Sequence, residues 1–421
     1  MKHAFKSTAF AVAILVCGNA FAATELETLK STVQTLMDRI EQLEAAEKAR
    51  LVEAEKIKEA RDVEKVSAAK KEARKQYAST PDSSGRVSSG NPSISVIGNF
   101  TGQRIRGSGD VRSSSFLPLS EAEFIFGANI DPHARLDVTV TAADGNMAVE
   151  EGFITAYLPW STNLKAGRKF LPVGRVNEQH PHALVYADRP NGLVNLFGPE
   201  IFIGDGLLLD RPFFIGESVH TVTAGLFSTQ NDVAFDPTGA NQYAGLVRWT
   251  GLWDMNGSTT FELGGNYIQG KNGIAGNNPL TRIAGVHFAL KNETVSHSGF
   301  ALEGEWLRRW QQQGAGVATS LTDGSYLLAT AALNRDWKLF SRLDYSRELN
   351  TALSSWNSES AVSIGGVWNV SEFQNLTLQY KHTRNALTEV AKDLGIAAGG
   401  KANAWYLRWV VAIGPHGAHG Y

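Results

Sequence analysis

The residues whose types could do chemistry gather in one stretch, residues 177–190, which reads NEQHPHALVYADRP. His180 and His182 are two positions apart, and Asp188 follows within the same stretch. Imidazole and carboxylate groups are ligands that zinc accepts, so this spacing presents a candidate metal site, with Glu178 as an alternative carboxylate. The competing interpretation is an ordinary polar loop, or weak and transient contact with ions. A sparser pair near the C-terminus, His416 and His419 in GPHGAHGY, is a second candidate for metal contact.

In the elements that must position these residues, period-two alternation of apolar and polar side chains dominates from Ile94 to Ile413. In QNLTLQYKH, for example, Leu376 and Leu378 take one face while Thr377 and Lys381 take the other. Such segments run for about ten residues, which is the length of a strand that crosses a bilayer at a tilt. Their polar faces carry charges at mid-strand, where a water-filled interior accepts them. Because backbone groups in lipid must be satisfied strand to strand, the sheet has to close.

The alternation therefore predicts an all-β transmembrane barrel of about 16 antiparallel strands, within a range of about 14 to 18. Barrels of this size leave an aqueous channel, so we expect an open lumen. The chain is too short for a 22-stranded transporter with a plug domain. A net charge of -2 gives no reason to expect a nucleic-acid partner.

The N-terminal part of the chain predicts export and self-association. Residues 1–22 have the charged, apolar and small-residue regions of a secretory signal peptide, which also contains Cys17. Residues 23–77 predict a coiled-coil helix, and residues 78–93 are a Ser-, Gly- and Pro-rich linker before the barrel at residues 94–421. The coiled-coil seam consists of Leu26, Leu29, Val33, Leu36, Ile40 and Leu43. All six are aliphatic, and the seam has no polar residue that would specify a dimer. A trimer is therefore at least as well favoured as a dimer. A single helix lying on the barrel is the alternative.

Residues 171–203 show no alternation and form the longest interruption in the barrel pattern. Long loops inside compact domains are usually functional, and this one follows about the fifth strand. We therefore expect it to fold inward and narrow the channel. The charged residues predicted to line this constriction are Arg168, Lys169, Arg175, Glu178, Asp188 and Arg189. Bases and acids are too evenly mixed there to decide ion selectivity.

A resemblance to known families rests on the same stretch. The run AGRKFLPVGRVNEQHPHALVYADRPN is similar to a strand and following loop of phosphate-selective-type porins. The NEQHPH core together with GPHGAH resembles a family of predicted zinc-regulated outer-membrane proteins, which are often called TonB-dependent-receptor-like although they lack a plug. The resemblance implies a 16-strand-type barrel and anion- or metal-linked uptake. The chain departs from the second family at Arg189, where a small residue is usual, and at Tyr421, where Phe is usual.

Together these features predict a porin in the Gram-negative outer membrane that passes small hydrophilic solutes or ions. The expected partners are outer-membrane lipid, further copies of the chain in a homotrimer, and the barrel-assembly machinery, which would recognise the C-terminal strand ending at Tyr421. No cofactor is required, although zinc is a candidate ligand. No serine or acid can be argued to act with lumen-facing His287, so we expect no enzymatic activity. The alternative is a non-conducting anchor or adhesin tethered through the coiled coil.

Overall fold

The computed structural model describes residues 92–107, 111–200, 202–229, 231–235, 243–274, 279–294, 297–314, 316–350 and 354–414. The signal peptide, the coiled-coil seam, nearly all of the linker and the pair His416 and His419 lie outside these described residues. Within the described ranges, none of the helices has the length and apolar character of a membrane span.

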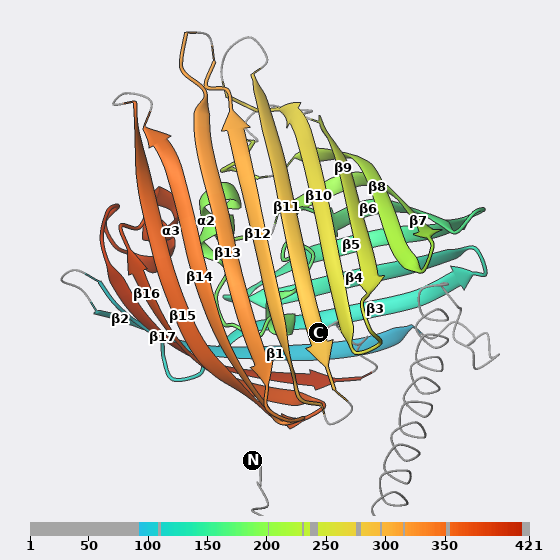
Figure 1. The fold of residues 1–421 in the computed structure, drawn as a ribbon, viewed down its shortest axis with the longest axis horizontal. Coiled ribbons are helices and arrows are strands. Elements are labelled where there is room, and N and C mark those ends of the chain that lie inside the picture. Colours follow the sequence, from blue (N-terminus) through green and yellow to red (C-terminus); the bar gives the residue numbers. More distant parts are fainter. Residues whose placement is uncertain are drawn as a thin grey trace, which may run out of the picture. The chain divides into compact units, whose positions relative to one another are not determined.

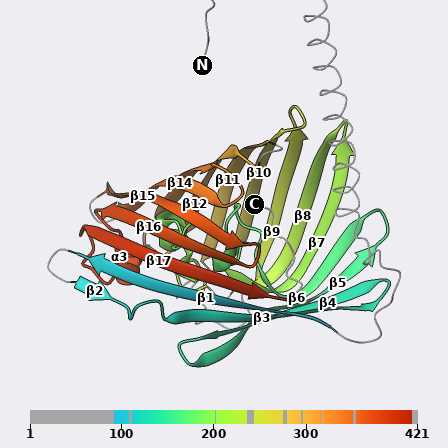
Figure 2. The same cartoon turned by 90° about the horizontal axis from the view of Figure 1, so that it is seen from below.

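Sixteen antiparallel strands form one closed barrel, as the alternation predicted (Figures 1 and 2). Closure is direct, because the first wall strand pairs with both the second and the last. The short β2 (Val111–Ser113) pairs with the end of the first strand and is not counted in the wall. The wall strands are β1 (Ser93–Arg106), β3 (Leu119–Asp131), β4 (Ala134–Ala143), β5 (Asn146–Leu158), β6 (Thr162–Phe170), β7 (Ile203–Ile215), β8 (Ser218–Thr229), β9 (Tyr243–Asp254), β10 (Thr259–Lys271), β11 (Leu280–Glu293), β12 (Gly299–Gln311), β13 (Ser320–Ala332), β14 (Trp337–Asn350), β15 (Ser355–Ser371), β16 (Gln374–Arg384) and β17 (Ala402–Ile413).

The two faces of the wall follow the period-two pattern of the sequence. In β17, Trp405 is 52% exposed on the outside, whereas Arg408 is 2% exposed and faces the interior. In β16, Leu378 is exposed and its neighbour Gln379 is buried. The outer face consequently carries a broad surface of exposed aliphatic and aromatic side chains.

The connections differ between the two ends of the barrel. At one end the strands are joined by short turns, such as residues 216–217 between β7 and β8. At the other end lie the long connections, including residues 385–401, which contain α3 (Thr388–Leu394). Residues 171–202, here called the inward segment, also start from this end and agree with the predicted 171–203 to within one residue. This segment contains the short 3-10 helix η1 (Pro181–Ala183) and α2 (Asn191–Phe197), the green helix behind the orange strands in Figure 1.

The interior is not uniformly polar, which departs from the wet lumen that the sequence predicted. Apolar residues of the inward segment, such as Leu193 and Phe197, form a buried core with inward-facing wall residues such as Ile268, Ile283 and Leu307. The contact is close at Gly192 of α2, where an added Cβ atom would lie 2.6 Å from the backbone nitrogen of Ser325 in β13. Part of the barrel's hydrophobic core is therefore inside the lumen, where it holds the inward segment.

Candidate functional site

The two ends of the inward segment are tied together by Asn177, which is fully buried. Its side-chain nitrogen donates to the carbonyl oxygens of Leu171, at 2.9 Å, and Phe202, at 2.8 Å. Its side-chain oxygen accepts from the Phe202 backbone N–H at 3.0 Å and from Arg189 at 3.2 Å. These four bonds close the segment at its base, where it leaves β6 and enters β7.

Asp188 fixes the part of the inward segment just before α2 to strands β14 and β16 of the wall. Its carboxylate accepts from Arg342 of β14 at 2.9 Å, from Lys381 of β16 at 2.5 Å and from Gln379 of β16. Burial alone would raise the pKa of Asp188, but the positive charges of Arg342 and Lys381 hold that pKa well below its ordinary range. The oxygens of Asp188 are therefore engaged by side chains of the wall, and its role as a metal ligand stays a prediction.

Arg408 of β17 holds the middle of the segment. Its guanidinium group donates to the backbone carbonyl oxygens of Pro181 and Tyr186, both at 2.8 Å, and also to that of Leu184. Buried carbonyl groups need donors, and Arg408 satisfies three of them from one side chain. This interaction sets the position of the backbone on both sides of His182.

The first part of the inward segment contacts strands β10 and β12 of the wall through Arg175. Arg175 pairs with Glu262 of β10 at 2.5 Å and with Glu303 of β12 at 2.9 Å. Its neighbour Gly174 has a positive φ of 62°, and a Cβ atom there would lie 1.8 Å from Glu305. Only glycine fits this approach, so the backbone here is held directly against the wall.

Two further predicted constriction residues meet near the base of the segment. Glu178 pairs with Arg248 of β9 at 2.5 Å and lies 3.8 Å from Lys169 of β6. Lys169 also pairs with Glu151 of β5 at 3.3 Å. Lys169, Arg175, Glu178, Asp188 and Arg189 are therefore all inside the barrel.

The sixth predicted constriction residue, Arg168, lies elsewhere. It follows the parity of the outward face of β6 and pairs with Asp205 of β7 at 2.9 Å, with side chains that are 35% and 40% exposed. On β7, Leu207 and Leu209 share the face of Asp205 and are exposed. The prediction that Arg168 lines the constriction is wrong, because adjacent residues of a strand face opposite sides and Lys169 takes the inward one.

His180 and His182 are brought together with carboxylates of β3 and β5, which form the second half of the site. His182 Nδ1 lies 2.8 Å and His180 Nδ1 lies 3.1 Å from the two oxygens of Glu123. His180 Nδ1 is also 3.8 Å from Glu150, and His180 Nε2 is 3.3 Å from Glu151. We call these two histidines, together with Glu121, Glu123, Glu150 and Glu151, the His–Glu cluster.

A β-bulge explains why two consecutive glutamates both reach this cluster. The pairing of β4 with β5 shifts register after Thr139, so that Glu151 and Val149 have partners on β4 and Glu150 has none. A bulge of this kind re-aims a side chain that would otherwise point to the other face. Glu150 thereby turns inward, where Thr141 donates to it at 2.8 Å.

The carboxylates of the cluster change the pKa of His180. Burial lowers the pKa of His180, but its hydrogen bonds and ion pairs with Glu123 and Glu151 outweigh burial and raise that pKa to about 10. An imidazole held between carboxylates in this way can carry a proton or, once neutral, bind a metal ion. Glu121, Glu123, Glu150 and Glu151 could not be assigned from sequence, although the first two were visible as polar alternate positions of one strand.

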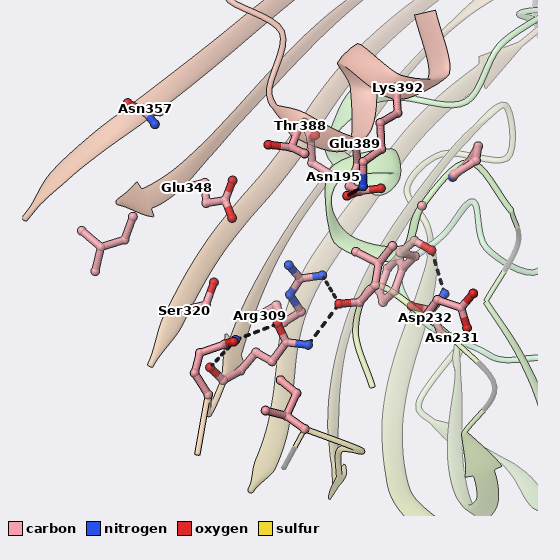
Figure 3. Close-up of a pocket in the computed structure, with 18 of the residues that line it drawn as sticks. Asn195, Asn231, Asp232, Arg309, Ser320, Glu348, Asn357, Thr388, Glu389 and Lys392 are labelled. Carbon is pink, nitrogen blue, oxygen red and sulfur yellow. Dashed lines mark hydrogen bonds and ion pairs between the residues drawn. The ribbon is translucent and has the colours of Figure 1, made fainter. Parts of the chain in front are cut away.

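Two cavities lie on opposite sides of the inward segment. One, of about 1080 Å³, opens at the end with the long connections and is lined by Asn195 and Phe197 of α2, with Glu348, Glu389 and Arg309 around it (Figure 3). The other, of about 830 Å³, is lined by residues 182–186 and by residues near the short turns, such as Lys338 and Phe373. The two cavities share no lining residue, and the inward segment contributes to the lining of both.

The comparisons with known proteins agree with the fold. No protein-family model matches the chain. An uncharacterized protein of Aquifex aeolicus is 24% identical over 261 residues, which are 55% of this chain and 54% of that protein. The chain thus spans about half the length of the curated relative that it matches. The resemblances to phosphate-selective-type porins and to the zinc-regulated family stay predictions.

Several solved structures are similar over the whole barrel. The anion-selective porin of Comamonas acidovorans has a TM-score of 0.53 at 12% identity, covering 77% of this chain and 100% of that porin. The outer membrane channel DcaP of Acinetobacter baumannii has a TM-score of 0.52 at 8% identity, covering 77% and 99%. The trimer form of OmpT, an outer membrane protein of Vibrio cholerae, has a TM-score of 0.51 at 10% identity, covering 77% and 100%. At these identities the likeness shows the fold alone: the chain has the 16-stranded barrel fold seen in outer-membrane porins.

Proposed function

We propose that the chain is an outer-membrane porin through which small hydrophilic solutes or ions diffuse, with the inward segment as its constriction. The observation that carries this proposal is that the inward segment lines two cavities, each with charged residues in its lining, inside a closed 16-stranded barrel. Barrels of this size are wide enough for an aqueous path, and an inward loop sets how much of it remains.

The proposed location rests on the outer surface of the barrel. Its exposed aliphatic and aromatic residues would face lipid, and the predicted signal peptide would direct export of the chain. Bacterial barrels have short periplasmic turns and longer extracellular loops. We therefore infer that the inward segment enters from the cell exterior, and that β17 is the strand recognised by the barrel-assembly machinery.

The charges around the cavity lined by α2 favour cations. Its lining contains the four acids Glu200, Asp232, Glu348 and Glu389 against the two bases Arg309 and Lys392, an excess of two negative charges. The second cavity has four acids and four bases, which balance: Glu293, Glu303, Asp336, Glu372, Arg175, Lys291, Arg335 and Lys338. A pore mouth of one sign raises the local concentration of the opposite ion. Of the anion-linked and zinc-linked roles expected from sequence, we favour the one linked to cations, and reversal potentials in a salt gradient should show a cation preference.

Deleting residues 176–198 is the direct test of the constriction. Because this removes most of the inward segment, we expect single-channel conductance in planar bilayers to rise clearly above that of the intact protein. Shortening the connection between β2 and β3 by residues 114–117, at the same end, is the control and should leave conductance nearly unchanged, because these residues line neither cavity. An unchanged conductance in the larger deletion, in a barrel that still shows heat-modifiable migration on gels, would reject the constriction. The absence of any channel events in the intact protein would instead favour the anchor or adhesin.

We further propose that the protein is a homotrimer held partly by the N-terminal coiled coil. Support comes from the seam of six aliphatic residues and from a barrel similar to the OmpT trimer form. Replacing Leu29 and Leu36 by aspartate places charges on this seam, so analytical ultracentrifugation in detergent should show fewer trimers. Replacing Lys30 and Gln34 by aspartate, off the seam, is the matched control, and equal trimer content in both variants would exclude a role for the seam.

A further inference from the structure

We propose that the His–Glu cluster is a binding site for one divalent transition-metal ion, with zinc as the representative ion. This ion would hold the inward segment against the barrel wall. The ligands assigned are Nδ1 of His180, Nδ1 of His182 and the carboxylates of Glu123 and Glu150. This set differs from the one expected from sequence, because Asp188 is replaced by two glutamates of the wall. The consequence for conductance rests on the proposed porin function, whereas the binding itself does not.

The distances within the cluster fit a small metal ion. Donor atoms of Glu123, His180 and His182 all lie within 4.8 Å of one another, and a second group of Glu121, Glu123 and Glu150 meets the same limit. Two ligands bound tetrahedrally at 2.0 to 2.2 Å from one zinc ion are about 3.3 to 3.6 Å apart. The measured separations of 2.8, 3.1 and 3.8 Å lie on both sides of this value, so small side-chain shifts suffice.

The charge of the cluster also calls for a cation. Four acidic side chains lie beside two histidines and one lysine, Lys169, so acidic groups outnumber basic groups by one. Buried charges are costly unless they are paired or bind metal ions. Glu123 is the most enclosed of the four, with 1% of its surface exposed. Its Oε2 atom lies 3.1 Å from His180 Nδ1, and Glu123 belongs to both groups of potential ligand atoms.

A second carboxylate orients the first histidine in the way that metal sites require. Metal-bound histidines usually donate their other ring N–H to a carboxylate, which fixes the tautomer. Glu151 lies 3.3 Å from His180 Nε2 and leaves Nδ1 facing Glu123 and Glu150. Glu151 is itself held by Lys169 and by the backbone N–H of Phe170 at 3.0 Å. The cluster therefore supplies both the ligands and the partner that positions one of them.

The position of the site gives the ion a mechanical role. Glu123 and Glu150 belong to β3 and β5, whereas both histidines belong to the inward segment, so an ion would cross-link the segment to this side of the wall. The other sides are held by Asp188, by Arg175 and by Arg408. Removal of the ion would loosen one side of the constriction while leaving the remaining contacts in place.

The test uses the full mature protein in detergent, stripped with a chelator and titrated with zinc by calorimetry and with cobalt(II) by visible spectroscopy. We expect one ion per chain and cobalt d–d bands of a four- or five-coordinate nitrogen and oxygen site. His182→Gln and Glu123→Gln should each weaken zinc binding at least tenfold. His220→Gln, at a buried histidine that contacts Ser218 in β8, is the matched control and should bind as the unmodified protein does. Heat-modifiable migration on gels shows whether each variant has folded.

Each remaining result bears on one proposal alone. Zinc binding that survives His182→Gln and Glu123→Gln, or that disappears when His416 and His419 are replaced by alanine, would overturn the site. A folded protein that conducts but binds no zinc would show that the cluster is a hydrogen-bonded His–Glu network only, and the porin would stand. A protein that binds one ion at the cluster but never conducts would keep the metal site and reject the porin. If both hold, chelation should increase conductance fluctuations, and added zinc should reverse them.

Discussion

Replacing Asp188 by asparagine should detach the part of the inward segment around residue 188 from β14 and β16. Both the conductance and the current noise of the channel should then rise. Asp188 and Asp344 balance the buried charges of Arg342 and Lys381, so the variant leaves one positive charge in excess. Removing one partner of a buried ion pair costs about 3 to 5 kcal/mol. The cost falls on the docked state of the segment, because the wall strands keep their own pairing. Single-channel recording and limited proteolysis of residues 171–202 measure the effect.

Asp205→Asn is the control for this variant, since it removes an acid whose pair with Arg168 lies on the outward face of the barrel, with side chains that are 40% and 35% exposed. Exposed pairs contribute about 0 to 1 kcal/mol, so this variant should conduct and resist protease as the unmodified protein does. An Asp188→Asn protein with unchanged conductance and unchanged protease resistance would show that the ion pairs do not hold the segment.

The same carboxylate predicts how the segment responds to acid. The pKa of Asp188 is held below its ordinary range in the folded protein, so its contribution to docking is present above the ordinary carboxylate pKa of about 4. That contribution is lost only as the pH falls through the lower, folded value. The protein should therefore keep a quiet, low-conductance state at pH 4, whereas the asparagine variant should be noisy at every pH.

The wall of the barrel could be predicted from sequence because period-two alternation is a local property. Each strand shows its two faces within about ten residues, so Trp405 and Arg408 could be assigned to opposite sides without knowledge of any partner. The same local signal identified the inward segment as an interruption. It failed at Arg168, which was grouped with its neighbour Lys169 by charge although a strand places adjacent residues on opposite faces.

What could not be predicted depends on partners far away in the chain. Arg408 was assigned to a polar face, but nothing in β17 indicates that it would bind carbonyl groups more than 200 residues earlier. Glu150 reaches the His–Glu cluster only because of a bulge, and register shifts leave no simple mark in the alternation. The apolar residues inside the lumen, such as Ile283, were missed for a related reason. In a barrel, an apolar residue is assigned to lipid unless something is known to cover it from within.

Arg408→Met is expected to have an effect as large as that of Asp188→Asn, but through the backbone rather than through charge. Methionine occupies much of the same volume, so the main loss is the donors to the carbonyl groups of Pro181, Leu184 and Tyr186. A buried acceptor left without a donor costs about 1 to 3 kcal/mol. The carbonyl of Pro181 keeps the backbone N–H of Leu184 at 3.3 Å, so the two acceptors left without a donor are those of Leu184 and Tyr186, and their loss should release this part of the segment. We expect higher conductance and faster hydrogen exchange of the backbone amides within residues 181–187.

Arg384→Met is the matched control, because Arg384 lies exposed on β16 and contacts only His382 among the bonds described for it. Its conductance and exchange should match those of the unmodified protein. Comparing Arg408→Met with Asp188→Asn distinguishes a constriction that opens as one unit from one that opens in parts. If Arg408→Met and Asp188→Asn each release the whole segment, residues 171–202 behave as one cooperative unit, and loss of any side contact opens the path. If Arg408→Met releases only residues 181–187 while α2 stays protected, the apolar core around Leu193 and Phe197 holds α2 independently of the ionic contacts.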